Sequence, residues 1–439
     1  MSKRFKNRFS VFLAAVIALS CFAGILSVNA EDGVAINAQN FPDDNFRAVV
    51  LDNYDTDSNG YLSPQESAAV SNMPLVFLAD GDINDLKGIE YFTELTSLYA
   101  ADLGIAQADF SALSKLASLR VNGNAFSTLN VSQNTALKEL NCRGCENLTE
   151  LILPQSITAL QCDGCALTSL DVSACTRLES LICYNNGIES LDLSSNTALA
   201  ELNCSYNKLS GLDLSANTLL ANSLTDYNLG NQTVNASATA NGKTISVPVS
   251  IGSAANIVSS SLADGGYNAQ NGAFEFSDYS SAQNGFKYEY NVNCPGAEYM
   301  SVNVTVSKDF YRVSYYESEG GALIDYSYVV SGQSAAAPAF PEAPEGGVCP
   351  RWSEQAVDVT SDMDIYAVWS AAHTYKVTAY ENKAATVQCE VCSDTYQVNI
   401  EDCMNSAVGD GNYDAALDVN HDGYITVRDH SLLYQGIFE

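Results

Sequence analysis

Histidine is scarce in this chain: only three of its 439 residues are histidines, and they are His373, His421 and His430. A Ser/His/Asp or Cys/His catalytic site built within residues 81–227, which contain no histidine, is therefore excluded. The H-E-x-x-H motif of zinc hydrolases and the G-x-S-x-G motif of serine hydrolases are also missing. Paired carboxylates for glycoside hydrolysis are not excluded by counting, but no segment has the length and α/β pattern of a glycosidase. We expect a binding protein and no enzyme, with an undetected hydrolase as the alternative.

Basic residues are few as well, because 20 Lys and Arg stand against 52 Asp and Glu, for a formal net charge of −32. Four of the basic residues lie in the first 30 positions, which contain no acidic residue, so the remaining chain has a balance of −36. Such a chain is a poor partner for nucleic acids and for anionic membrane surfaces. Divalent cations are better partners for such a chain, although most of its acidic residues are explained by their contribution to solubility.

Long apolar runs are limited to one, from Val11 to Leu26. Four basic residues precede this run, and Val28, Asn29 and Ala30 follow it as small or polar residues suited to cleavage. This pattern predicts a signal peptide at residues 1–30, cleaved after Ala30. No later run is long and apolar enough to span a membrane. We expect a secreted, extracellular protein, either free or associated with the cell surface.

A repeat occupies the middle of the chain. Successive blocks open at seven apolar residues, spaced by 21, 21, 20, 21, 21 and 21 positions: Leu95, Leu116, Leu137, Ile157, Leu178, Leu199 and Leu220. The clean blocks read L-x-x-L-x-C-x-x-N-x-L followed by x-x-L-D-L-S-x-N-T. One block cannot bury its apolar edge alone, so the blocks are expected to stack as coils of a solenoid. With strands about 4.8 Å apart, about six coils give a face about 30 Å long, which suits a macromolecule better than a small metabolite.

This pattern resembles the leucine-rich repeat, in a short variant with Cys at the second inward strand position. The resemblance implies a parallel sheet whose outward residues bind a protein or polysaccharide partner. The expected partner-binding residues are Tyr99, Arg120, Asn141, Arg143, Gln161, Ile182, Tyr184 and Asn203. Asn122, Asp163 and Ser205 share the same outward register. Asn186 and Asn207 recur where an amide can bond the backbone of the next turn and form a ladder along the stack.

Thirteen cysteines in an exported chain usually indicate disulfides, but here the repeat explains many of them. An inward column contains Cys142, Cys162, Cys183 and Cys204, where buried thiols act as small apolar groups. Cys145 and Cys165 occupy the ladder column, so the two C-x-x-C pairs of these coils, which match a zinc-ribbon spacing, are assigned to the repeat. We expect mostly reduced cysteines.

A calcium-loop pattern precedes the repeats. The spacing D-x-D-x-N-G-x-x-x-x-x-E matches the EF-hand loop. The expected ligands are Asp55, Asp57, Asn59, the carbonyl of Tyr61, Ser63, through water, and the bidentate Glu66. The alternative is an Asp/Asn-rich turn that caps the following helix without metal. The segment also resembles the N-terminal caps of leucine-rich-repeat proteins exported by bacteria.

Two β-rich segments follow the repeats. In residues 228–308, apolar and polar residues alternate over short runs, which predicts a β-sandwich-like module that also closes the repeat stack. Residues 309–370 open on F-Y-R-V-S-Y-Y and close on V-T-S-D-M-D-I-Y-A-V-W, and they resemble the internalin-type B-repeat, a small β-grasp module. The resemblance implies a stalk or spacer.

The end of the chain contains a second calcium pattern, D-x-N-x-D-G-x-I-x-x-x-D, which resembles a dockerin repeat. Its expected ligands are Asp418, Asn420, Asp422, the carbonyl of Tyr424 and Asp429. The resemblance implies docking to a cohesin-type scaffold, as in a cellulosome component. The upstream copy, near Gln397 to Asp402, lacks the first ligands. Cys389 and Cys392 form a C-x-x-C that allows a redox pair, half a metal site or a disulfide, with only Cys403 close in sequence.

Together these observations predict an α+β multidomain protein whose cofactor is calcium. The expected parts are a signal peptide at 1–30, an EF-hand-like helical cap at 31–80, leucine-rich repeats at 81–227, a sandwich-like module at 228–308, a B-repeat β-grasp module at 309–370 and a dockerin-like segment at 371–439.

Overall fold

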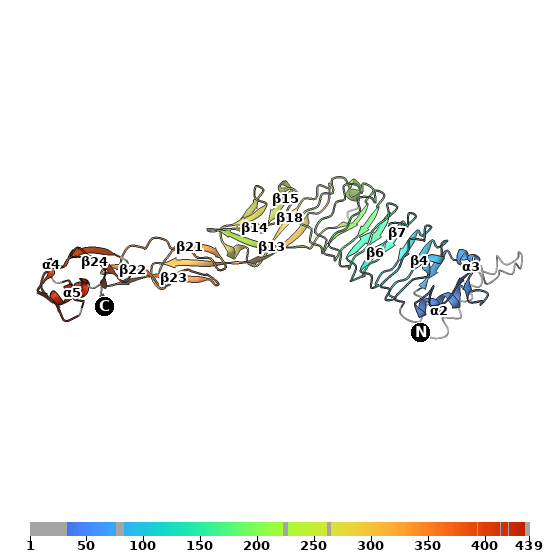
Figure 1. The fold of residues 1–439 in the computed structure, drawn as a ribbon. Coiled ribbons are helices and arrows are strands. Elements are labelled where there is room, and N and C mark those ends of the chain that lie inside the picture. Colours follow the sequence, from blue (N-terminus) through green and yellow to red (C-terminus); the bar gives the residue numbers. More distant parts are fainter. Residues whose placement is uncertain are drawn as a thin grey trace. The chain divides into compact units, whose positions relative to one another are not determined.

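The computed structural model describes residues 33–75, 83–222, 227–260, 265–392, 394–412, 414–419 and 421–434 (Figure 1). The predicted signal peptide and the predicted calcium ligand Asn420 lie outside these residues. The chain forms two compact units. The first comprises Met1–Val234, Ile251–Ser261 and Lys287–Val304, and the second comprises Asn235–Ser250, Leu262–Phe286 and Thr305–Glu439. The helices of the described segments are too short or too polar to cross a bilayer.

Two short helices with strong N-caps open the first unit. In α2 (Asp44–Asn53) the carboxylate of Asp43 accepts from the backbone amides of Asn45 and Phe46 at 3.0 and 2.9 Å. In α3 (Pro64–Ala69) Ser63 and Glu66 form a reciprocal capping box, and Pro64 begins the helix where a missing amide costs nothing. The strand β2 (Tyr61–Leu62), between the helices, pairs antiparallel with β1 (Val34–Ala35), which precedes α2.

The repeats form an eight-stranded sheet, stacked one strand per coil (Figure 1). Its strands pair in parallel and in the order of the chain: β3 (Asn72–Pro74), β4 (Ser97–Tyr99), β5 (Ser118–Arg120), β7 (Glu139–Asn141), β9 (Ala159–Gln161), β10 (Ser180–Ile182), β11 (Glu201–Asn203) and β12 (Tyr227–Asn228). A second parallel pair, β6 (Thr128–Asn130) and β8 (Glu150–Ile152), joins two neighbouring coils elsewhere on the stack. A 3-10 turn, η3 (Ile89–Tyr91), lies before β4, and η4 (Thr218–Asn222) follows β11.

The interior of the stack is built from the repeating leucines. The strand centres are in register from Leu98 through Leu119 and Leu140 to the later coils, and these leucines are between 0 and 2% exposed. Burial of one such side chain stabilises the fold by about 1.5–3 kcal/mol. The inward cysteines Cys142, Cys162, Cys183 and Cys204 are each 0% exposed, which confirms their predicted place in the core.

A side-chain ladder runs along the stack, as predicted. The amide of Asn186 donates to the carbonyls of Cys162 and Cys183 at 3.0 and 3.1 Å. At the equivalent position, the thiol of Cys165 donates to the carbonyl of Cys142 at 3.3 Å. The predicted structural role of these C-x-x-C cysteines is thereby confirmed.

A second ladder, absent from the predictions, lies at the S-x-N-T turns. The amide of Asn196 donates to the carbonyls of Val172 and Cys175 at 2.9 and 2.8 Å. The amide of Asn217 donates in the same way to the carbonyls of Leu193 and Asn196. These bonds satisfy backbone groups that a coil without regular secondary structure would otherwise leave unpaired.

The last coil of the stack is closed within the first unit. The hydroxyl of Tyr288 donates to the carbonyl of Ser210 at 2.7 Å, and the amide of Leu214 donates to the carbonyl of Val292 at 2.7 Å. Tyr288 lies in β18 (Phe286–Tyr290), which pairs with β15 (Ile257–Ser260). The segment after the repeats therefore covers the stack, as the sequence predicted.

Residues 228–308 contribute to one seven-stranded sheet in the order β15-β18-β19-β13-β14-β17-β16. The sheet folds back on itself, because the ring centroid of Phe286 lies 4.8 and 5.2 Å from those of Phe274 and Phe276, although several strands separate these residues in the sheet order. Besides β15 and β18, the strands are β13 (Gln232–Asn241), β14 (Thr244–Pro248), β16 (Gly266–Asn268), β17 (Ala273–Phe276) and β19 (Met300–Lys308). Short 3-10 turns, η5 (Ala254–Asn256) and η6 (Tyr279–Ser281), lie between strands.

Residues 309–370 form a four-stranded sheet in the order β21-β20-β23-β22. The strands are β20 (Phe310–Tyr316), β21 (Leu323–Val330), β22 (Cys349–Trp352) and β23 (Met363–Ser370). The first and last strands of the module, β20 and β23, pair in parallel, while the outer pairings are antiparallel.

The last segment combines a three-stranded antiparallel sheet with short helices. The sheet contains β24 (Tyr375–Glu381), β25 (Ala384–Cys389) and β26 (Thr395–Asn399). After it come α4 (Ile400–Cys403), the pair β27 (Ser406–Ala407) and β28 (Tyr424–Ile425), η7 (Ala415–Leu417) and α5 (Val427–Tyr434). Val387, Ile400, Leu417 and Leu433 share one buried core.

Candidate functional site

The predicted partner-binding residues form a row across the outer face of the repeat sheet. Strand register aligns the last residue of each strand with the last residue of the next. This row contains Tyr99, Arg120, Asn141, Gln161, Ile182 and Asn203. Each follows a buried leucine, and because side chains alternate along a strand, each lies on the opposite face. Arg143 lies two residues after Asn141, and Tyr184 lies two residues after Ile182, so both widen this face beside the row.

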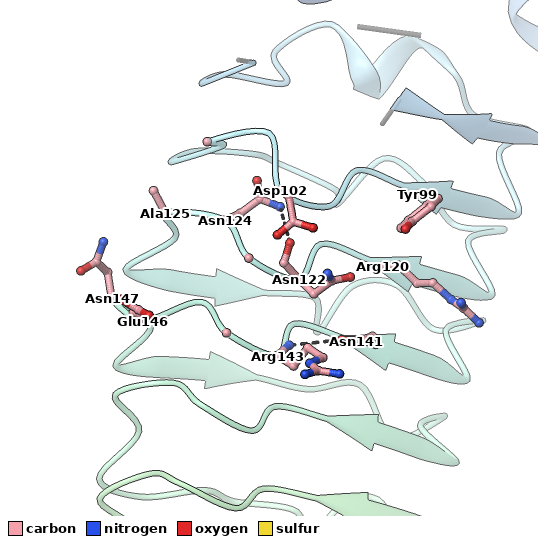
Figure 2. Close-up of a pocket in the computed structure, with 13 residues that line it drawn as sticks. Tyr99, Asp102, Arg120, Asn122, Asn124, Ala125, Asn141, Arg143, Glu146 and Asn147 are labelled. Atoms are coloured by element: carbon pink, nitrogen blue, oxygen red, sulfur yellow. Dashed lines mark hydrogen bonds between the residues drawn. The ribbon is translucent and has the colours of Figure 1, made fainter. Parts of the chain in front are cut away.

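A groove with a volume of about 800 Å³ begins at the N-terminal half of this row (Figure 2). Four of the predicted residues line it, namely Tyr99, Arg120, Asn141 and Arg143. Further polar side chains come from the loops after the strands: Asp102, Asn122, Asn124, Glu146 and Asn147. Figure 2 shows Tyr99 and Arg120 at the strand ends, with Asp102 and Asn122 on the adjoining loops. The groove therefore offers two guanidinium groups, an aromatic ring and several amides to one ligand surface.

The adjoining strands are tied together by polar contacts. The amide of Asn141 donates to Oε1 of Gln161 at 2.7 Å. Nε of Arg143 lies 3.8 Å from Oδ2 of Asp163. Asp163 was expected on the outward face, yet it is only 3% exposed, because the neighbouring side chains cover it. A hydrogen bond from Tyr184 to the same carboxylate raises the pKa of the Tyr184 phenol.

A smaller hollow of about 220 Å³ continues the face toward later coils, and Gln161 and Ile182 are among its lining residues. The sequence did not single out the loop residues Asp102 and Glu146. Position in the repeat could have indicated Asp102, because it lies 21 residues before Gly123, at the equivalent place in the loop of the preceding coil.

The first predicted calcium loop brings its carboxylates together. Oxygens of Asp55, Asp57 and Glu66 all lie within 4.8 Å of one another. Two oxygens bound to one Ca²⁺ at 2.3–2.6 Å are at most about 5 Å apart, so this donor set fits the ion. Gly60 has a φ of +82°, as the sharp turn of such a loop requires.

Hydrogen bonds within this loop hold its last ligand in place. Oε1 of Glu66 accepts from the backbone amide of Thr56 at 2.6 Å, and Oε2 accepts from the amide of Ser63 at 2.9 Å. Burial alone raises the pKa of Glu66, but the bonds from Ser63 and Thr56 outweigh it and lower the pKa below its ordinary value. The carboxylate is therefore charged at neutral pH. The side chain of Asn59 is engaged by Asp57, with Nδ2 donating to Oδ2 at 2.9 Å.

The second predicted loop contains two buried carboxylates, Asp418 at 3% and Asp429 at 0% exposure. Asp418 accepts from the amides of Asp422 and Gly423 at 3.1 and 2.8 Å. Asp429 accepts from the amides of Val419 and Thr426 at 3.1 and 2.9 Å. Hard oxygen donors on a loop of this kind fit calcium. Tyr424 begins β28, and its ring is 57% exposed, so its carbonyl is the only part assigned to the loop.

The stack of 21-residue coils with one parallel strand each is a leucine-rich-repeat fold. No protein-family model matches the chain, and no curated protein matches it. Solved structures of similar fold include the functional domain of InlJ from Listeria monocytogenes, which includes a cysteine ladder. That domain is 22% identical with a TM-score of 0.41, and the match covers 50% of this chain and 50% of that one, so this chain spans half of its length.

Two further Listeria monocytogenes proteins are similar in the same way. The secreted internalin-like protein Lmo2445 is 13% identical with a TM-score of 0.37, over 63% of this chain and 98% of that one. Internalin C2 is 19% identical with a TM-score of 0.33, over 48% of this chain and 90% of that one.

Proposed function

We propose that this protein is an extracellular, calcium-binding protein that recognises a protein partner through the outer face of its repeat sheet. The groove at Tyr99, Arg120, Asn141 and Arg143 carries the proposal, because it gathers Tyr and Arg, the residue types that dominate binding energy at protein interfaces. The row of strand ends extends this surface to Asn203. Its length suits a macromolecular surface better than a small molecule.

The guanidinium groups of the groove favour a protein over a neutral polysaccharide. Arg120 and Arg143 are both exposed in a chain whose net charge is −32. Their guanidinium groups can form paired hydrogen bonds with carboxylates, which a protein partner presents and a neutral polysaccharide lacks. Asp102 and Glu146 line the same groove, so a partner surface that presents both carboxylates and basic groups matches it.

Calcium is the second part of the proposal. The convergence of three carboxylates at Asp55, Asp57 and Glu66 supports one ion in the N-terminal loop. The buried pair Asp418 and Asp429 supports a second ion near the C-terminus. In this account both ions are structural, because they neutralise clustered carboxylates and fix the loops next to short helices.

Docking to a cohesin-type scaffold is the second candidate function, and the loop from Asp418 to Asp429 followed by α5 favours it. We rank docking below recognition by the repeat face, because the upstream residues Gln397 and Asn399 lie in β26 and not in a second calcium loop. Recognition by the repeat face is therefore the function we place first.

The test uses the full chain with an aromatic photo-crosslinking amino acid in place of Tyr99, which leaves both arginines of the groove intact. The matched control replaces Arg177, which is exposed in a turn outside the strands. Both variants are illuminated with an extracellular protein fraction and with soluble polysaccharides. We expect a protein adduct only from position 99, suppressed by excess unlabelled wild-type chain and not by an excess of Arg120→Glu. Equal adducts at both positions, or a carbohydrate adduct alone, contradict recognition of a protein.

A further inference from the structure

Four side chains with metal-binding atoms converge in the second unit, and none of them belongs to a predicted calcium loop. They are Cys349, His373, Cys389 and Cys392, and one ligand atom from each lies within 4.8 Å of all the others. The Sγ atoms of Cys349 and Cys389 are 3.3 Å apart. Sγ of Cys392 is 3.4 Å from Nδ1 of His373. The sequence had shown only the C-x-x-C pair, with Cys403 as its nearest cysteine neighbour.

The spacing of these atoms fits a tetrahedral ion. Zn–S bonds of about 2.3 Å and Zn–N bonds of about 2.0 Å at tetrahedral angles place two sulfurs about 3.8 Å apart, and a sulfur and a nitrogen about 3.5 Å apart. The Cys392–His373 separation matches the second value, and the Cys349–Cys389 separation is close to the first. A disulfide needs about 2.05 Å and would use only two of the four groups. All four groups are used by one Cys₃His site.

The backbone around the cluster is arranged to hold thiolates. Cys389 ends β25, and the amide of Val391 donates to its Sγ at 3.4 Å. The amide of Cys389 donates to the carbonyl of Asp394 at 2.8 Å, which closes the loop containing Cys392. A thiolate sulfur is the better acceptor for such an amide than a thiol, so this contact favours the metal-bound form.

Contacts around His373 orient its ring. The ring of Tyr375 stacks on the imidazole, with centroids 5.1 Å apart and planes 21° from parallel. The hydroxyl of Tyr375 donates to Oδ2 of Asp394 at 2.8 Å, so the stacking ring is itself held by the loop that follows Cys392. Partners outside the ligand shell commonly fix metal-binding histidines in this way.

We propose that Cys349, His373, Cys389 and Cys392 form a structural zinc site. Cys349 begins β22 of the four-stranded sheet, whereas the other three ligands flank the sheet of β24, β25 and β26. The ion therefore cross-links two successive modules within the second unit. Four protein ligands leave no open position for a substrate, so the site is structural and not catalytic.

The other cysteine-rich region does not compete for this role. Cys145 and Cys165 donate to the carbonyls of Val121 and Cys142 at 3.3 Å each, and they serve as rungs of the repeat ladder. Among the described residues, the solenoid cysteines contribute to no group of metal ligands.

The test measures metal in the full chain, purified from zinc-supplemented cells and washed with a calcium-selective chelator. We expect one zinc per chain by elemental mass spectrometry in the wild type and in the control Cys165→Ser. Cys349→Ser and Cys392→Ser should each lose it. Zinc that also persists in both of these variants, or a wild type without zinc, overturns the proposal.

A second measurement keeps the test independent of how the variants fold. The zinc-stripped wild-type chain is reconstituted with Co²⁺, and we expect the visible absorption of tetrahedral cobalt together with a thiolate-to-metal charge-transfer band. Added zinc should bleach both. An octahedral cobalt spectrum, or a disulfide between Cys349 and Cys389 in the intact protein mass, contradicts the site.

Discussion

At the scale of single residues, the stack depends on side chains that bond to the backbone of neighbouring coils. Asn207 donates to the carbonyls of Cys183 and Cys204 at 3.0 Å each, and its own Oδ1 accepts from the amide of Ile188 at 3.0 Å. Cys165 fills the equivalent place in an earlier coil with one weak thiol donor. The amide positions are therefore expected to contribute more to stability than the thiol positions.

Asn207→Ala tests this role. The side chain is 3% exposed, and its loss leaves buried carbonyls without a donor, which costs about 1–3 kcal/mol per unsatisfied group. We expect a lower urea midpoint by circular dichroism. The control is Tyr206→Ala, at a neighbouring side chain that is 57% exposed, with an expected effect within about 0.5 kcal/mol. Equal losses for the two variants would contradict the ladder's role.

Glu66 is the residue that tests the first calcium loop. Glu66→Gln keeps a side chain able to complete the capping box with Ser63 but removes the charge that the ion needs. At a calcium concentration 100 times Kd, binding stabilises the folded state by about 2.7 kcal/mol. We expect Glu66→Gln to lose the part of the calcium-dependent rise in Tm that comes from this loop, whereas Asp52→Asn, on the exposed side of α2, keeps it. An unchanged rise in Glu66→Gln refutes the assignment.

The pH dependence of the same loop follows from Glu66. Hydrogen bonds lower its pKa in the folded state, so the charged carboxylate contributes stability above the unfolded pKa of about 4.3. That contribution is lost as the pH falls through the lowered folded value. The calcium-dependent rise in Tm should therefore be constant between pH 7 and about 5, well above the ordinary range of the group. A decline that starts near neutral pH would assign the effect to another group.

At the scale of elements, the repeat period fixes both the buried and the outward face. On β10, Leu181 is buried in the stack, and its neighbour Ile182 lies on the outer face. The period also fixes a left-handed residue once per coil, as at Gly123, Gly144 and Asn185 with φ of +68°, +67° and +55°. Glycine adopts this conformation without steric cost, and Asn185 adopts it in a later coil.

Leu181→Ala and Ile182→Ala form a matched pair on one strand. Removal of the fully buried leucine should cost about 2–5 kcal/mol, because a cavity remains between coils. Removal of the half-buried isoleucine should cost about 1 kcal/mol or less. Denaturant unfolding of both variants tests which face is buried. A larger loss of unfolding free energy for Ile182→Ala than for Leu181→Ala would mean that the face with Ile182 is the buried one.

At the scale of the whole molecule, the sequence predicted what local patterns encode. Spacing alone located the coils and the inward cysteines, because each depends on residues close together in the chain. The order of the seven strands after the repeats was not predicted, because strand pairing over long distances has no local signal. The same reason hid the Cys₃His cluster, in which Cys349 meets Cys389 across 40 residues. The buried state of Asp163 was also missed, since period 2 gives the direction of a side chain but not what covers it.

The central claim is that the outer face at Arg120 recognises a protein. The measurement is the affinity, by surface plasmon resonance, of the protein captured at position 99 for wild type, Arg120→Glu and Arg177→Glu. Because both variants reverse one charge, net charge is matched. We predict a loss of at least about tenfold, or about 1.4 kcal/mol, for Arg120→Glu, and wild-type affinity for Arg177→Glu. Equal affinities of the two variants would contradict the claim.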